Sequence, residues 1–453
     1  MIVLEICVAG AGAGKTTKMA DNIIRLRRKI DESKMIYCVT FTNNAVLCIE
    51  SKLKEYYGIL PNNIIVSTIH SFLYRELIKP YYYLLYGKHY QKISVARLPD
   101  DVKYRNAKIK RLDEQNILHQ TVIPERAKWV IHQKASDTKT IKNKRNIIIQ
   151  KIESYCGAIC VDEAQDIDRD MQIIIEGFGE QNIKVVLMGD PKQDLRGHNC
   201  FRNLIEKYKD SVTYIEDCFR CPIKHLKLSN LLVEDSQKQH SSKEHGVVTV
   251  WFESEKTCAD LLKEYEFDLS YISKKQGMYD THIKENNTDI TLSLSEEIAP
   301  ILRRNHTSLE DIILKKTAYY FAGKIITSYR ENRDRVLAIK QFTNYEKISR
   351  KDYGILINAI PENRIEEVRD TIVVSSIDSI KGKEGKNCLF ILTTDLAAYL
   401  FAKKTSDNAT KNRLYVALTR SLESLTIFIT VEVEIQYGKT NIIDFFAKNL
   451  TVQ

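Results

Sequence analysis

Short runs of apolar residues alternate with amphipathic stretches along both halves of the chain. Continuous apolar runs bounded by polar turns are typical of strands that are buried on both faces of a parallel sheet. Their alternation with helical patterns predicts an α/β protein with two parallel sheets, one in each half. The predicted strands are Ile2–Val8, Met35–Thr40, Ala158–Val161 and Val185–Met188 in the first half, and Val247–Phe252, Leu269–Ile272, Thr371–Ser375, Cys388–Thr393 and Leu425–Thr430 in the second.

Two polar segments with a mainly helical pattern interrupt the strand-bearing regions. The first is basic and opens with a run of tyrosines at Tyr81, Tyr82 and Tyr83. Because neither segment repeats the other, we interpret each as an insertion into one sheet. The sequence therefore predicts a first α/β domain at 1–75 and 155–212 with a basic helical insertion at 76–154, and a second α/β domain at 213–285 and 365–453 with a helical insertion at 286–364.

Composition adds a clustered positive charge to this picture. The 453 residues are 43% hydrophobic, which is enough to fill real cores, and the formal net charge is +9. Between Lys79 and Lys151, 17 basic residues face 6 acidic ones. A clustered basic surface suits a polyphosphate backbone, but a solvated helical face has the same composition, and both interpretations stay open.

The cysteines and the N-terminus indicate the cellular compartment. Ten cysteines show no paired framework, and several lie in apolar runs, as expected of reduced thiols in an intracellular protein. No signal-peptide pattern and no membrane-length apolar run is present, so we expect a cytoplasmic protein without a membrane partner. Cys218 and Cys221 have the spacing of a zinc knuckle, but no second pair with ligand spacing follows them.

A glycine-rich segment lies between the first predicted strand and a helical pattern. Glycines let the backbone fold tightly enough for its N–H groups to face phosphate oxygens, and the helix N-terminus adds a favourable dipole. Lys15 would reach the β and γ phosphates of ATP, and the Thr16 hydroxyl would be a ligand of Mg²⁺. A plain strand–helix turn is the alternative. The predicted nucleotide-binding residues are Ala9, Gly10, Ala11, Gly12, Ala13, Gly14, Lys15, Thr16 and Thr17.

Two adjacent carboxylates follow the predicted strand Ala158–Val161. An acidic residue at the carboxyl end of a strand can hold a metal ion, and we assign this role to Asp162. Glu163 is placed to orient and deprotonate an attacking water. A surface acidic turn is the alternative, but beside a P-loop the pair favours ATP hydrolysis over phosphate transfer to a small molecule.

Further blocks follow in a fixed order: Thr40-Phe41-Thr42-Asn43, Ser67-Thr68-Ile69-His70-Ser71-Phe72, Gly189-Asp190-Pro191-Lys192-Gln193, Cys218-Phe219-Arg220, Ser375-Ser376-Ile377-Asp378-Ser379-Ile380-Lys381-Gly382-Lys383-Glu384 and Tyr415-Val416-Ala417-Leu418-Thr419-Arg420. With the P-loop and the paired carboxylates, this series resembles the superfamily 1 DNA helicases of the UvrD/Rep type. The resemblance covers nearly the whole chain. It implies two RecA-like P-loop domains with parallel sheets, each carrying a mainly helical insertion, and ATP bound between them.

The resemblance implies catalytic roles for three further residues. Gln193 would sense the γ-phosphate from the first domain. Arg220 and Arg420 would reach across from the second domain as arginine fingers on the developing phosphoryl charge. A surface cation on a helix is the alternative for Arg420, although the apolar residues before it favour the catalytic role.

Contacts to the base and the ribose are implied in the same way. Phe219 replaces the tyrosine that commonly stacks on adenine in this family, so stacking can persist. Gly382 and Glu384 would lie on the ribose side. The family also carries an upstream glutamine that selects adenine, and this chain begins too close to its first strand to include one, which leaves the choice of base open.

DNA contacts are expected after the strands of the first domain. Phe41 is the best candidate for stacking on a base, which is worth roughly 1–3 kcal/mol and tolerates any sequence. A core phenylalanine at a strand end is the alternative. His198, or Arg196, stands in for the aromatic residues that the family has after Gln193. The expected nucleic-acid contacts are Phe41, Thr42, Asn43, Thr68, His70 and His198.

We therefore expect an ATP-dependent translocase and helicase that moves 3′ to 5′ on single-stranded or tailed duplex DNA. Asp378 replaces a family histidine near DNA, and the gap from Arg220 to Ser375 is short for the family's fourth subdomain. The first departure predicts an altered grip on DNA at this position, and the second favours a motor that works inside a complex. The alternative is a regulatory subunit of a partner nuclease, as in phage-defence systems such as Gabija. A third hypothesis, a binding module with a decayed ATPase, is disfavoured by the intact phosphate-handling residues.

Overall fold

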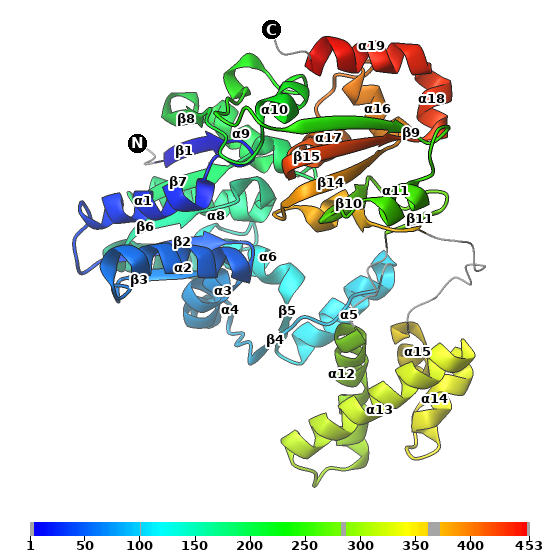
Figure 1. Ribbon diagram of the computed structural model, residues 1–453. Coiled ribbons are helices and arrows are strands. Elements are labelled where there is room, and N and C mark those ends of the chain that lie inside the picture. The colour runs from blue at the N-terminus through cyan, green and yellow to red at the C-terminus, as the bar shows by residue number, and fades with distance from the viewer. Residues whose placement is uncertain (1–3, 100, 282–286, 361–371, 451–453) are drawn as a thin grey trace. The chain divides into compact units, whose positions relative to one another are not determined.

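The computed structural model describes residues 4–99, 101–281, 287–360 and 372–450 (Figure 1). The chain forms two compact units. Unit 1 consists of Met1–Lys88, Ile123–Thr281 and Ile372–Gln453, and unit 2 of His89–Val122 and His282–Thr371. The described residues of both predicted α/β domains fall in unit 1, together with residues 76–88 and 123–154 of the first predicted insertion, whereas positions 282–285 and 365–371 of the second domain lie outside the described residues. Positions 2, 3, 286, 361–364 and 371, which the sequence placed in strands or in the second insertion, lie outside the described residues.

The first sheet of unit 1 has six parallel strands in the order β3-β2-β6-β7-β1-β8. Alternate strand residues on one face pack against helices α1 and α2. The residues between them on β2, β6 and β7 are buried as well, and burial of both faces explains the nearly continuous apolar runs. The strands are β1 Leu4–Ala9, β2 Met35–Thr40, β3 Ile64–Thr68, β6 Cys156–Val161, β7 Lys184–Gly189 and β8 Val212–Ile215.

The second sheet of unit 1 has five parallel strands in the order β13-β10-β14-β15-β9. Its buried core includes Ala11 and Leu195, which belong to loops of the first sheet. The two sheets therefore share packing. The strands are β9 Val247–Phe252, β10 Leu269–Ile272, β13 Ser375–Ser376, β14 Gly385–Leu392 and β15 Ser421–Ile429, and a separate pair consists of β11 Tyr279–Asp280 and β12 Ile372–Val373.

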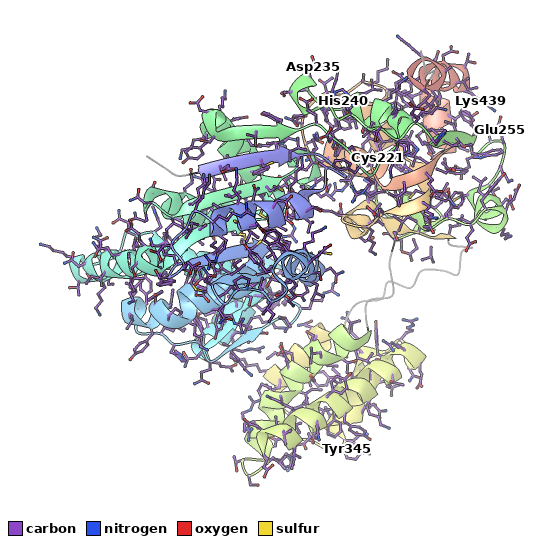
Figure 2. All side chains as sticks on the ribbon, turned by 60° about the vertical axis from the view of Figure 1, so that its left-hand side comes forward. Cys221, Asp235, His240, Glu255, Tyr345 and Lys439 are labelled. Carbon is purple, nitrogen blue, oxygen red and sulfur yellow. The ribbon has the colours of Figure 1, made fainter. Side chains whose placement is uncertain are left out.

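Helices connect the strands of unit 1 in crossover fashion, as parallel pairing requires. Helix α19 begins at Lys439, whose ammonium lies 2.6 Å from Glu255 after β9 (Figure 2). The helices around the first sheet are α1 Lys15–Arg27, α2 Asn43–Tyr57, α3 Ile69–Phe72, π-helical η1 Leu73–Tyr82, α4 Tyr83–Tyr86, α6 Ile123–Ile131, α7 Lys139–Tyr155, α8 Arg169–Glu180 and α9 Cys200–Lys207. Those around the second sheet are α10 Ile223–Asn230, α11 Cys258–Glu264, α16 Thr394–Leu400, α17 Ala409–Leu418, α18 Val431–Tyr437 and α19 Lys439–Leu450. Short 3-10 turns lie at η2 Gln120–Val122 (in unit 2), η3 Ala164–Asp166, η4 Pro191–Gln193, η5 Lys209–Ser211, η6 Asp235–Gln237 and η7 Ile377–Ile380.

Unit 2 joins parts of both predicted insertions. Buried Glu297 lies 2.8 Å from Lys108 and 2.6 Å from Arg111, so an acidic residue of the second insertion binds two cations of the first. Exposed Tyr345 lies on this unit (Figure 2). Its elements are β4 Lys92–Ser94, α5 Val102–Glu114, β5 Ile117–His119, α12 Asn287–Asn305, α13 Asp311–Asn332, α14 Arg335–Thr343 and α15 Arg350–Ala359.

The prediction of an α/β fold with two parallel sheets is confirmed. The sequence missed β3, β8 and the small strands β4, β5 and β11. The predicted strand Thr371–Ser375 was wrong as a single element, since its described part divides between β12, which pairs with β11, and β13, which pairs with β10. Across the described residues, none of the helices has the length and apolar character needed to cross a membrane.

Candidate functional site

The predicted site residues of the first sheet gather at one edge. In a parallel sheet all strands end on the same side, so the loops after β1, β2, β3, β6 and β7 meet there. The glycine-rich loop follows β1, and the paired carboxylates follow β6 two strands away. The fold therefore brings together groups that lie about 150 residues apart in the chain.

The loop after β1 has the conformation that its glycines allow. Gly12 and Gly14 both adopt φ of +70°, a region that favours glycine, and Gly14 caps helix α1. The Lys15 ammonium donates to the carbonyls of Ala9 at 3.5 Å and Gly10 at 3.3 Å. The cation therefore already lies inside the loop, where a phosphate could replace these carbonyls as its partner.

Asp162 directly follows β6, and Thr40 ends the adjacent strand β2; the residues before them, Val161 and Val39, are paired. Within the described residues, Asp162 Oδ1 and Thr40 Oγ1 are buried without a hydrogen-bond partner. Buried polar atoms are rarely left unpaired, so these two indicate a missing polar ligand. Burial, with a smaller effect from neighbouring Glu163, raises the pKa of Asp162 to about 7. The oxygen atoms of Asp162 and Thr40 suit Mg²⁺ and its water ligands. The half-buried Thr16 hydroxyl on α1 is a further oxygen that could bind the ion.

Glu163 is held in an unusual conformation beside Asp162. Its φ of 56° places a residue other than glycine in the left-handed region, which is a mark of functional sites. Its carboxylate accepts a hydrogen bond from Gln165. Burial by itself would raise the pKa of Glu163, but Lys15, the Gln165 hydrogen bond and Lys381 together hold it below its ordinary value. The carboxylate is thus kept ionised, as a proton acceptor must be.

A chain of hydrogen bonds leads from Glu163 to Gln193. Gln165, which donates to Glu163, accepts from the Asp190 backbone N–H at 2.9 Å. Gln193 Nε2 in turn donates to Asp190 Oδ2 at 2.9 Å. All three side chains beyond Glu163 are buried. Neither Gln165, two residues after Glu163, nor Asp190, three residues before Gln193, had a role predicted from the sequence.

Phe219 and Arg220 come from the segment after β8 and lie against the glycine-rich loop. The Phe219 N–H donates to the Gly12 carbonyl at 2.9 Å, and a Cβ on Gly14 would lie 3.7 Å from the Phe219 ring. The ring is 61% exposed, so it is free to stack on a base. Arg220 Nε donates to Glu384 at 2.6 Å, which brings together two residues that were predicted separately.

Arg420 is buried, with 1% of its surface exposed, which corrects the alternative of a surface cation. Its guanidinium donates to the carbonyls of Val416 at 3.0 Å and Lys383 at 3.2 Å. Burial lowers its pKa, and nearby Arg220 adds to this effect. In this conformation Arg420 supports the Lys383 carbonyl beside Glu384, and Gly382 closes the same turn with φ of +82°.

The expected nucleic-acid residues lie at the carboxyl ends of β2, β3 and β7 and in the segments and helix starts that follow these strands. Thr42 and Thr68 accept N–H hydrogen bonds from Ala45 and Ser71, so both cap helices. Phe41 and His70 are half-buried, and Asn43 and His198 are exposed. Burial lowers the pKa of His70, whereas nearby Asp168 acts in the opposite direction.

Polar contacts shape two further segments that were expected near DNA. Asp194 accepts from the N–H groups of Gly197 at 2.7 Å and Asn199 at 2.8 Å, which folds the turn that presents His198. Asp378 accepts two hydrogen bonds from the Arg413 guanidinium, at 2.9 and 3.1 Å. The arginine neutralises the acidic residue that replaces the family histidine.

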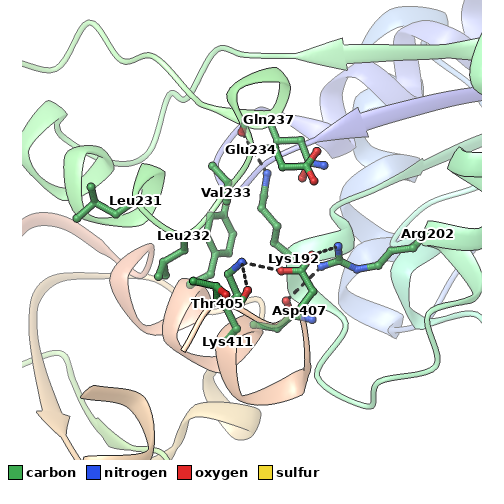
Figure 3. A pocket seen from close by; sticks show the side chains of 12 residues that line it. Lys192, Arg202, Leu231, Leu232, Val233, Glu234, Gln237, Thr405, Asp407 and Lys411 are labelled. Carbon is green, nitrogen blue, oxygen red and sulfur yellow. Dashed lines mark hydrogen bonds and ion pairs between the residues drawn. The ribbon is translucent and has the colours of Figure 1, made fainter. Parts of the chain in front are cut away.

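A pocket of about 340 Å³ lies beside Tyr415 in unit 1 (Figure 3). Asp407 binds both Arg202 at 2.9 Å and Lys411 at 2.6 Å across it. Because this carboxylate neutralises two of the three cations on the wall, we assign no phosphate to the pocket. Its lining residues are Lys192, Arg202, Leu231, Leu232, Val233, Glu234, Gln237, Thr405, Asp407, Lys411, Asn412 and Tyr415.

The two closely spaced cysteines make contacts of another kind. The Cys218 thiol donates to the Ala11 carbonyl at 3.1 Å, and the Cys221 thiol donates to the Thr419 carbonyl at 3.5 Å. Both side chains are buried. In the part of the chain that the structure describes, no group of three or more His, Cys, Asp or Glu side chains could hold a metal ion.

Comparisons with known proteins show what the chain is similar to. Residues 3–198 match the family model described as "AAA domain". The chain is similar to "Gabija protein GajB" of Bacillus cereus (strain VD045), with 28% identity over 317 residues that cover 67% of this chain and 58% of that protein. The matched region therefore spans little more than half of the relative. A solved structure titled "The structure of PRRSV helicase" aligns with a TM-score of 0.34 and 10% identity, over 94% of this chain and 52% of that one. The family model supports an AAA-type domain over the residues that carry the glycine-rich loop and the paired carboxylates.

Proposed function

We propose that this chain is a DNA-stimulated ATPase that translocates 3′ to 5′ along single-stranded DNA and separates tailed duplexes. The observation that carries the proposal is the convergence of both sheets on one glycine-rich loop. Lys15 and Glu163 come from the first sheet, while Phe219 and Arg220 approach the same loop from the segment that leads to the second. A nucleotide bound there would contact both sheets.

Each of these residues has a defined task in ATP hydrolysis. The loop N–H groups and Lys15 bind the phosphates, and Glu163 accepts a proton from the attacking water. Gln193 senses the γ-phosphate and reports to Glu163 through Asp190 and Gln165. Arg220 leaves Glu384 to stabilise the charge that develops on the transferred phosphoryl group.

Mg²⁺ would be held by Asp162 and Thr16. When bound, it supplies positive charge that neutralises the phosphate oxygens. The unpaired Oδ1 of Asp162 supports this assignment. The proposed roles in phosphate binding and hydrolysis do not depend on which purine is bound. The base contact described here comes from the Phe219 ring, which can stack on adenine or on another purine.

Arg420 would act as a second arginine finger only after leaving its carbonyl partners. In the described conformation it holds the turn that carries Glu384. We therefore propose that Arg420 first supports the ribose side of the site and that nucleotide binding releases it. DNA would be gripped by Phe41, Thr42, Asn43, Thr68, His70 and His198.

ATP turnover measured without nucleic acid, with single-stranded DNA and with RNA tests this proposal. We expect stimulation by DNA, and absence of turnover under all three conditions would overturn it. Duplexes with either a 3′ or a 5′ tail test the polarity. Opening of only the 5′-tailed substrate would show that the direction is wrong.

A second candidate function is a regulatory subunit in which ATP and DNA control a partner nuclease. The likeness to a Gabija protein and the small set of helices α12–α15 favour it. A cytoplasmic defence complex would then be its setting. Efficient unwinding by the isolated chain would count against this candidate, and DNA-stimulated ATP turnover without unwinding would support it.

A further inference from the structure

Gln239 is a buried glutamine that no block in the sequence analysis included. Only 3% of its surface is exposed. Its backbone is clamped by Asn230 on α10, whose side chain donates to the Gln239 carbonyl at 2.9 Å and accepts from the Gln239 N–H at 3.0 Å. These two hydrogen bonds fix the backbone position of Gln239, and with it the start of its side chain, next to helix α10 of the second sheet.

The amide of Gln239 binds the glycine-rich loop together with Tyr415. Gln239 Nε2 donates to the Ala11 carbonyl at 3.1 Å, and the Tyr415 hydroxyl donates to Gln239 Oε1 at 2.9 Å. The Ala11 N–H donates to the same hydroxyl at 3.1 Å. These three hydrogen bonds form a closed ring that joins the N–H and the carbonyl of one loop residue, Ala11, and all three residues are buried.

The loop sequence is matched to this glutamine. A Cβ on Gly10 would lie 2.2 Å from Gln239 Cδ, a distance that real Cβ atoms do not show. Gly10 does not adopt a positive φ, so its backbone conformation does not demand glycine. Any side chain at position 10 would therefore have to displace the Gln239 amide.

We propose that Gln239 is a positioning residue that sets the phosphate-binding loop from the second sheet, and that Tyr415 acts with it. The inference rests on the proposed ATPase function. Buried donors and acceptors need their partners, so Gln239 and Tyr415 orient the Ala11 N–H and carbonyl, and the Cys218 thiol is a further donor to the same carbonyl. We therefore infer that the glycine-rich loop is preorganised to bind ATP when Gln239 and Tyr415, on the side of the second sheet, contact it.

Gln239→Met tests the proposal because it keeps the side-chain volume and removes both hydrogen bonds. We expect the KM for ATP to rise about tenfold, as for the loss of buried hydrogen bonds, with kcat within about twofold of wild type. A merely structural defect lowers the fraction of active molecules and therefore lowers kcat with KM unchanged. Gln237→Met, made in the same segment at a side chain outside the ring, is the matched control and should keep the wild-type KM.

Tyr415→Phe removes a single hydroxyl and decides the question if Gln239→Met does not fold. We expect a similar rise in KM, and the double variant should be no worse than either single variant, since the two residues act as one network. A wild-type KM in a folded Gln239→Met or Tyr415→Phe protein, or full additivity of the two changes, would overturn the proposal. Failure of the wild-type chain to hydrolyse ATP would instead overturn the ATPase assignment on which it rests.

Discussion

The ammonium of Lys381 lies 2.5 Å from the carboxylate of Asp166. Lys381 follows η7 at the edge of the second sheet, and Asp166 ends η3, directly after the paired carboxylates of the first. Burial raises the pKa of Asp166, whereas Lys381 acts in the opposite direction. The same lysine helps to keep Glu163 ionised. One side chain thus connects the second sheet to the proposed catalytic base.

Lys381→Met should weaken the stimulation of ATP turnover by DNA by about tenfold, within the usual range of coupling between sites. The reason is that the variant removes the ion pair between Lys381, directly after η7, and Asp166, which lies three residues after Glu163. Turnover should be measured with and without single-stranded DNA. Lys386→Met, which breaks only an exposed pair with Glu423, is the control and should behave as wild type. Equal stimulation in Lys381→Met and wild type would contradict the prediction.

Glu163→Gln should lower ATP turnover by at least about 100-fold while ATP still binds, because general base catalysis contributes this much and the amide cannot accept the proton. Single-turnover measurements and nucleotide-binding titrations separate the two steps. Unchanged hydrolysis in Glu163→Gln would exclude Glu163 as the base.

Lys15→Ala should instead weaken nucleotide binding, since it removes the cation from the loop.

The strands that carry the site were predictable because burial in a parallel sheet leaves continuous apolar runs. Strand β8 escaped detection because it is a short edge strand with exposed and half-buried residues, as its sequence Val212–Ile215 shows. The glycine-rich loop and the carboxylates were predictable because their chemistry depends on adjacent residues. Local sequence therefore predicted the part of the site that the first sheet supplies, namely the glycine-rich loop and the paired carboxylates.

Tertiary contacts account for what the sequence missed. Gln239 lies in a polar stretch without periodicity, and its role depends on a loop 228 residues away. The burial of Arg420 was not predictable because its partners are backbone carbonyls, which any residue type supplies. Unit 2 was missed as one body because Glu297 and its two cations lie in separate insertions.

Asp137→Ala should destabilise unit 1 by about 3–5 kcal/mol, because it leaves a buried arginine without its counter-ion. Arg145 lies 2.6 Å from Asp137, and both side chains are almost fully buried. Chemical denaturation followed by Trp129 fluorescence measures the loss, since the Trp129 carbonyl also accepts from Arg145. Asp235→Ala, at an exposed pair with Lys238 (Figure 2), is the control and should unfold at the same denaturant concentration as wild type.

The double variant Asp137→Ala/Arg145→Met separates the loss of the ion pair from the loss of packing. Removing both charges leaves no buried ion, so we expect it to recover much of the stability that Asp137→Ala loses. If the double variant is less stable than Asp137→Ala by the full cost of a second independent change, the two residues do not act as a pair.

The pH dependence of stability should contain a contribution from His225. This residue on α10 is fully buried, its Nε2 donates to the Val247 carbonyl at 3.1 Å, and its Nδ1 has no partner within the described residues. Burial lowers its pKa, although the contacts with Val247 and Ser421 act in the opposite direction. The folded protein therefore binds fewer protons than the unfolded chain below about pH 6.5, the ordinary histidine value.

The sign follows from this difference in bound protons. The contribution of His225 is fully present above about pH 6.5 and is lost as the pH falls toward the lowered folded-state pKa, at a rate of at most about 1.4 kcal/mol per pH unit. Urea denaturation at pH 7.5 and 5.5, followed by Trp251 fluorescence on the adjacent strand β9, measures it. His225→Gln cannot titrate and should flatten the dependence, whereas exposed His240→Gln should leave it unchanged. An equally steep dependence in His225→Gln would show that other groups account for the loss of stability in acid.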